Sequence, residues 1–354
     1  MFKCSMRNLA ALAASVSALL CMVFTETAYA HVKWFCAFDV SGQPKGLENV
    51  LCADFEIFVV LALLCVLAGG IIERTFIGAA MTRALDSVTG RLRIETTMLI
   101  RATCFFFFVS LWTLGGIILT PELTTTLTAI SWLQLAIAAG LLWRQMLPLS
   151  ALGIVFLFGF GVYQHGIFHL LDYPIFLGVA LYLALIGLRR DFFGVRPLDV
   201  VRWSAAITLM WASMEKWAYP QWTFSLLISH PNLTMGYDNE TFMRAAGAVE
   251  FALSFALLWT PLVRRVAAII LIGMFVSAVV EFGKIDAIGH SVIIVILLAI
   301  VGDNAPAAVQ EKKTFGAMFA KPLVLATASY GMALAGFMAI YYALHAVIFG
   351  TTIG

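Results

Sequence analysis

Long runs of apolar residues recur along almost the whole chain, and they restrict what it can fold into. Most of them approach the roughly 17–25 residues that an α-helix needs to cross the hydrocarbon core of a bilayer. The composition agrees, since 62% of the 354 residues are apolar and only 12% are charged. A soluble globular domain does not have this balance. The sequence therefore predicts an all-α polytopic membrane protein, and nothing in it is typical of a protein that binds nucleic acid.

The apolar runs predict about ten transmembrane helices. Residues 54–96 contain the first helix and a cytoplasmic connector, whose 74–96 part is either an interfacial amphipathic helix or a solvated loop. Residues 303–321 are expected to be a cytoplasmic linker, and 322–354 to contain the C-terminal transmembrane helix. The predicted helices lie near 54–73, 97–119, 127–143, 148–164, 173–188, 203–219, 241–259, 266–282, 287–302 and 322–349.

The first thirty residues have the features of a signal peptide. Lys3 and Arg7 precede an apolar stretch over 9–24, and a small-x-small cleavage site ends at Ala30. We therefore expect residues 1–30 to be a signal peptide, with an uncleaved signal anchor as the alternative. Cleavage would place the mature N-terminus outside the cytoplasm.

The distribution of basic residues predicts the orientation of the helices. Of the 22 Lys and Arg residues, two precede the cleavage site, fifteen fall at the predicted cytoplasmic ends and loops, and five fall on the other side. Those five are Lys33, Lys45, Lys216, Arg244 and Lys284. This is a clear positive-inside bias. We expect a protein of the bacterial inner membrane, with both the mature N-terminus and the C-terminus extracytoplasmic.

Two cysteines lie in the predicted extracytoplasmic segment, residues 31–53. An oxidising compartment permits a disulfide between Cys36 and Cys52. The sequence therefore predicts that these two cysteines are joined.

Two parts of the chain resemble each other at a nearly constant offset. The stretch LQLAIAAGLLW, which ends at Trp143, is similar to VEFALSFALLW, which ends at Trp259. This similarity predicts two tandem four-helix units in parallel orientation, with one flanking helix at each end. The units are 97–188 and 199–302. Chance similarity between apolar segments is the alternative.

All six histidines lie on the predicted outer side of the membrane, together with several carboxylates and two lysines at helix ends. An ionised group within a transmembrane helix costs at least about 2.5–3.5 kcal/mol unless it is paired or hydrated. Glu250 therefore needs a partner, and Lys216 on the neighbouring helix is the nearest by topology, either as a structural clasp or as part of a site. The candidate catalytic residues are Glu215, Lys216, Glu250, Glu281, Lys284, Asp286 and His290.

Histidines also provide a candidate metal site. His165 and His169 are four residues apart and would share one face of a continuous helix, and Asp172 could orient an imidazole. His31 would become an N-terminal copper ligand after cleavage. These four residues could hold copper or haem. Gly166 favours a turn that would break the helical spacing.

Aromatic residues provide a candidate cofactor site. Trp211, Trp217 and Tyr163 could form the wall of a pocket for a quinone or another flat ligand. Contact with lipid explains the same residues without any ligand.

The second four-helix unit resembles the DoxX/DoxD family of membrane proteins. Arg202 lies near the start of a predicted helix, and the stretch SMEKW, which contains Lys216, lies at its end. After a polar loop comes the stretch AGAVEFALSFALLW, which contains Glu250. The first unit departs from this pattern, because Gln134 stands where the family pattern has a Glu. The resemblance implies a membrane subunit of a quinone-linked redox system or of an envelope-stress system, working with a membrane redox or envelope partner protein. It leaves open whether the chain is an enzyme.

Two other functions remain as alternatives. One is an extracytoplasmic metal-handling protein, for copper or haem, which uses the histidine layer. The other is a small-solute transporter or a complex-assembly subunit, which a parallel repeat also suits.

Overall fold

The computed structural model describes residues 32–189, 194–234, 236–304 and 315–351. Helices dominate these ranges, and the only β contact in them is an isolated bridge between Ile117 and Thr124. The all-α fold class is confirmed for this part of the chain. The predicted signal peptide, His31 and most of the predicted linker after Asn304 lie outside the described residues.

A helix is present at each of the ten predicted positions. These helices are α4 (Ala53–Ile72), α5 (Phe76–Leu114), α6 (Thr128–Leu141), α7 (Leu147–His165), α9 (Pro174–Leu188), α10 (Pro197–Ala218), α12 (Asn239–Ala256), α13 (Pro261–Phe282), α14 (Lys284–Gly302) and α15 (Phe315–Phe349). Short helical segments connect them: α2 (Val32–Phe35), α3 (Leu47–Val50), η1 (Arg144–Met146), α8 (Ile167–Leu170), η3 (Pro220–Thr223), α11 (Phe224–Ser229) and η4 (Pro231–Thr234).

Six of the described helices are long and apolar enough to cross a membrane: α4, α5, α7 with η1, α13, α14 and α15. The helices α6 and α9 are apolar but shorter. The helices α10 and α12 are more polar, because α10 carries Asp199, Arg202, Glu215 and Lys216 and α12 carries Glu240, Arg244 and Glu250. The long apolar helices make this an integral membrane protein by composition and length.

Proline and glycine define several helix ends. Proline occupies one of the first two positions of α7, α9, α10 and α13, where its missing N–H removes no helical hydrogen bond. Gly166 ends α7 with a φ of 84°, and Gly283 ends α13 with a φ of 81°. Only glycine adopts this backbone conformation without strain. Both glycines lie where the chain reverses at the same end of the bundle.

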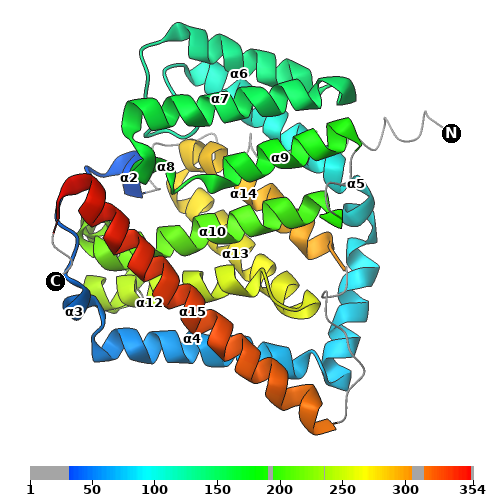
Figure 1. Ribbon diagram of the computed structural model, residues 1–354, viewed down its shortest axis with the longest axis vertical. Coiled ribbons are helices and arrows are strands. Elements are labelled where there is room, and N and C mark those ends of the chain that lie inside the picture. The colour runs from blue at the N-terminus through cyan, green and yellow to red at the C-terminus, as the bar shows by residue number, and fades with distance from the viewer. Residues whose placement is uncertain (1–31, 190–193, 235, 305–314, 352–354) are drawn as a thin grey trace.

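Eight helices pack as a closed ring. Each of α5, α6, α7 and α9 contacts the next, as do α10, α12, α13 and α14. Contacts of α9 with α10 and of α14 with α5 join the two series. The remaining two helices lie outside the ring, α4 against α12 and α15 diagonally across α10 and α4 (Figure 1).

The segment predicted as a connector, 74–96, is helical from Phe76 and continuous with the second predicted transmembrane helix. Helix α5 first runs along one end of the bundle and then turns into it (Figure 1). Arg93 donates to the carbonyl of Gly302, and Asp86 pairs with Arg265, so this first part is held against the ends of α13 and α14. The structure therefore has a helix here rather than a loop.

Charged residues concentrate at the two ends of the bundle. At one end, hereafter the Asp303 end, Asp303 lies 3.0 Å from Arg196 and 3.0 Å from Arg264. The side chains of Arg264 and Arg265 are 2% and 0% exposed. The opposite end, hereafter the Lys33 end, holds all the residues predicted as a functional site that the structure describes.

Candidate functional site at the Lys33 end

The short helix α2 carries Lys33 into the bundle. The Lys33 side chain is only 2% exposed, and its ammonium pairs with Asp172, between α8 and α9, and with Glu215, near the end of α10. Glu122 and His169 lie beside these residues, with 3.9 Å between His169 Nε2 and Glu122 Oε1. We call Lys33, Glu122, His169, Asp172 and Glu215 the Lys33 cluster. It joins the N-terminal segment to both halves of the ring.

Opposite charges hold Lys33, Asp172 and Glu215 together. Burial by itself would lower the pKa of Lys33, but the charges of Asp172 and Glu215 and their hydrogen bonds outweigh it and raise the pKa. Burial and the neighbouring Glu215 raise the pKa of Asp172, and Lys33 opposes them. The ammonium also lies 5.7 Å and 5.5 Å from the ring centroids of Phe38 and Trp222, which adds cation–π attraction. Lys33 therefore stays charged although it is buried.

The next residue, Trp34, contacts a second group of predicted site residues. Its ring lies 4.9 Å from that of His290, which also contacts Phe275 at 4.8 Å. His290 Nδ1 is 2.9 Å from Asp286, whose side chain is fully buried. A side chain at Gly289 would overlap the Trp34 ring. Helix α2 therefore packs against the start of α14 as well as against the Lys33 cluster.

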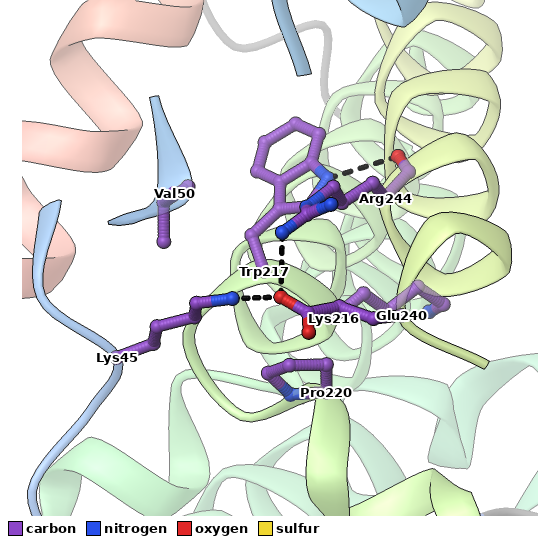
Figure 2. Close-up of a pocket in the computed structure, with 7 residues that line it drawn as sticks. All are labelled: Lys45, Val50, Lys216, Trp217, Pro220, Glu240 and Arg244. Atoms are coloured by element: carbon purple, nitrogen blue, oxygen red, sulfur yellow. Dashed lines mark hydrogen bonds and ion pairs between the residues drawn. The ribbon is translucent and has the colours of Figure 1, made fainter. Parts of the chain in front are cut away.

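The predicted pairing of Lys216 and Glu250 is present. Lys216 Nζ lies 2.7 Å from Glu250 Oε2, although the preceding residue, Glu215, points to Lys33. Lys216 lines a small cavity together with Lys45, Val50, Trp217, Pro220, Glu240 and Arg244 (Figure 2). Glu240 pairs there with both Lys45 and Arg244. The cavity measures about 10 Å³, which is room for no more than one water.

A double-mutant cycle on this pair is expected to give a coupling free energy of about 0.5–3 kcal/mol. Lys216→Ala and Glu250→Ala should each destabilise the protein, and the double variant should lose less than the sum of the two. The Lys216 side chain is 27% exposed, so water lessens the cost of breaking the pair. Thermal or denaturant unfolding in mild detergent measures the three variants. Strictly additive losses would contradict the pairing.

The other candidate residues are dispersed. Glu281 lies 3.7 Å from His230, and Lys284 begins α14. Trp217 donates to the carbonyl of Arg244, whereas Tyr163 is 85% exposed. These residues share the Lys33 end, but they do not converge on one site.

Trp211 lies within a buried aromatic group, one helical turn deeper than Glu215. Its ring is 5.0 Å from that of Tyr341 on α15 and 5.7 Å from that of Phe168 on α8. The indole N–H of Trp211 and the hydroxyl of Tyr341 are buried and make no hydrogen bond. The aromatic group therefore contains two buried donors that have no acceptor among the described residues.

The predicted histidine pair does not share one helix face. His165 ends α7, Gly166 breaks the helix as expected, and His169 belongs to α8. Their ring centroids are 6.0 Å apart and the rings are nearly perpendicular. Among the described residues no three His, Cys, Asp or Glu side chains gather as a metal site. His31, the fourth candidate ligand, lies outside the described residues.

The predicted disulfide is not formed. Both Cys36 and Cys52 are free thiols in the structure. Cys36 Sγ lies 3.3 Å from the hydroxyl of Ser225 on α11, and Cys52 precedes the first residue of α4. The docking of α2 in the bundle places Cys36 against α11, which the prediction did not take into account.

No sequence pattern indicated that Lys33 and Glu122 would belong to a buried site. Lys33 stands in a short polar segment, and Glu122 stands in a Thr-rich connection between two helices. Both would ordinarily be solvated. Their burial follows from the folding of residues distant in the chain, since Lys33 pairs with Asp172, 139 positions away.

Comparison of the chain with protein-family models, with curated proteins and with solved structures finds no match. The fold and the site thus define an all-helical integral membrane protein with a buried ionisable cluster at one end.

Proposed function

We propose that this chain is a DoxX-like membrane subunit of a quinone-linked redox system and that it binds a quinone headgroup beside Trp211 and Tyr341. The observation that carries the proposal is the pair of buried donors without hydrogen bonds, Trp211 Nε1 and Tyr341 OH. A quinone is flat, apolar and soluble in the bilayer, and its carbonyl oxygens accept hydrogen bonds. A buried donor that lacks an acceptor is costly, so such an acceptor is strongly favoured there.

The surroundings of these donors support the same ligand. Phe168 lies against both Trp211 and Tyr341, with 5.7 Å and 5.0 Å between ring centroids. Asp172 and Glu215 of the Lys33 cluster lie near Tyr341. An aromatic wall next to ionisable groups suits a ligand whose reduction consumes protons. No comparable grouping of described residues supports a copper or haem site.

We also propose a membrane location and a tandem repeat for this protein. We place the protein in the bacterial inner membrane with the Lys33 end extracytoplasmic, because the sequence predicts fifteen basic residues at cytoplasmic ends and loops and five on the other side. The two tandem units, 97–188 and 199–302, have the same order of packing, α5–α6–α7–α9 and α10–α12–α13–α14. This agreement supports the repeat. The redox partner that supplies electrons is a separate membrane or envelope protein.

Binding of a short-chain ubiquinone analogue tests the proposal. Purified protein in mild detergent is expected to show saturable quenching of tryptophan fluorescence. Tyr341→Phe removes one donor, which is worth about 0.5–1.5 kcal/mol, and should weaken binding by about three- to tenfold. Fluorescence remains measurable because every tryptophan is retained.

The matched control is Tyr237→Phe, which removes the hydroxyl of an exposed tyrosine in the loop before α12. It should leave the dissociation constant unchanged. Quenching without saturation in folded wild-type protein would overturn the quinone proposal, as would an equal loss of affinity in the two variants.

A further inference from the structure

Buried polar atoms without hydrogen bonds gather around the Lys33 cluster. They include both carboxyl oxygens of Glu122, Nε2 of His169, Oδ1 of Asp172 and the hydroxyl of Tyr173. The great majority of buried polar atoms in proteins are paired. The Lys33 cluster is therefore a part of the protein where buried polar groups are unusually concentrated.

The charges within the cluster do not balance. Lys33 pairs with two carboxylates, Asp172 and Glu215. Glu122, whose side chain is 2% exposed, is a third carboxyl with no cation of its own among the described residues. An isolated carboxylate in such a place is expensive, and binding a proton removes the cost.

The groups that face Glu122 favour its neutral form. Burial raises the pKa of Glu122 to about 7, whereas its own backbone N–H and weaker interactions with Lys33, Thr120 and Trp34 oppose the shift. Burial together with the charges of Lys33 and His165 lowers the pKa of His169 to about 3, so this imidazole stays neutral. The ionised form of Asp172 also disfavours ionisation of Glu122, since the two carboxyls repel each other. Burial and the repulsion from Asp172 thus both favour the neutral form of Glu122.

Two histidines connect Glu122 to the surface. His165 is half-buried, and its Nε2 lies 3.0 Å from the carbonyl oxygen of Thr124. The His165 and His169 rings are 6.0 Å apart, and His169 Nε2 is 3.9 Å from Glu122. The three side chains thus lie in succession between the half-buried His165 and the buried Glu122.

We propose that Glu122 is a proton-binding site, which receives a proton from the aqueous phase through His165 and His169 and holds it inside the protein as a neutral carboxylic acid. The proton adds to one carboxylate oxygen of Glu122, and no other bond forms or breaks. The net charge of the cluster rises by one unit. This inference does not depend on a quinone, because it concerns an exchange with water.

Infrared spectroscopy of the full-length protein across a pH titration tests the proposal. Wild-type protein is expected to show the carbonyl band of a protonated carboxyl that disappears with a midpoint of about 7. The band should be lost in Glu122→Gln, shift in frequency in Glu122→Asp, and remain in Glu48→Gln, which alters an exposed glutamate. A band that persists unchanged in Glu122→Gln would overturn the proposal, as would the absence of any such band in wild-type protein.

Stability provides a second readout. The pKa of Glu122 in the folded protein lies above its ordinary value of 4.5, so its contribution is fully present below that pH and is lost as the pH rises through about 7. The thermal midpoint of wild-type protein should therefore fall over this interval, and Glu122→Gln should flatten the decline. An equally steep decline in Glu122→Gln would count against the proposal.

The same titration distinguishes a proton from a metal cation. It is repeated in sodium chloride and in choline chloride at equal ionic strength. Equal midpoints support a proton site. A midpoint that is lower in sodium would show that Na⁺ competes for the carboxylate and would overturn the assignment to a proton alone.

Discussion

Replacement of Lys33 by methionine is expected to lower the free energy of unfolding by about 3–5 kcal/mol. The side chain keeps nearly the same length but loses its charge, so Asp172 and Glu215 remain buried next to each other without a cation. The loss should appear as a lower thermal midpoint in mild detergent. It is the largest single effect that we expect at the Lys33 end, because this ammonium neutralises two carboxylates.

Two further variants make this result specific. Lys321→Met removes an exposed lysine at the other end of the bundle and should change stability by less than about 1 kcal/mol. Adding Glu215→Gln to Lys33→Met should recover part of the loss, since it removes one of the two orphaned charges. A Lys33→Met variant as stable as wild type would contradict the buried pairing.

Asp303→Asn is expected to cost a similar amount, about 3–5 kcal/mol. The Asp303 carboxylate lies 3.0 Å from Arg196, 3.0 Å from Arg264 and 3.8 Å from Arg202. Removing its charge leaves the buried guanidinium of Arg264 without its closest anion. Thermal unfolding at low and high salt provides the measurement, and the loss should be nearly independent of salt because buried charges are poorly screened.

The control for this prediction is Asp54→Asn. Asp54 is 54% exposed and lies 3.4 Å from Arg244. An exposed ion pair contributes about 0–1 kcal/mol, and salt screens it. Equal losses in Asp54→Asn and Asp303→Asn would show that burial at the Asp303 end has no special effect.

Local patterns in the sequence predict a large part of the fold. Apolar runs place the helices because their length and composition act within a single segment. The pair Lys216 and Glu250 was also predictable, since the helices that carry them are joined by one loop and an unpaired charge is costly in an apolar layer. Gly166 predicted the break that separates His165 from His169.

Other features could not be predicted from local patterns. The helix over 76–96 mixes arginines with apolar residues, so a loop was an equal alternative, and contacts with Gly302 and Arg265 hold it at the end of the bundle. A disulfide between Cys36 and Cys52 was expected from the compartment alone. Nothing in the sequence indicated that α2 packs against α11, which places Cys36 next to Ser225.

The amino-acid sequence determines the helical segments and their apolar character, because these depend on neighbouring residues and on the thickness of a bilayer. Only the tertiary structure decides where the charges meet. Helix α2 has four residues and no periodicity of its own, yet it brings Lys33 to Asp172 and Glu215. Glu122 makes no ion pair with a lysine or arginine among the described residues. The physical reason is that pairing of buried charges depends on contacts between segments far apart in the chain, which no local pattern records.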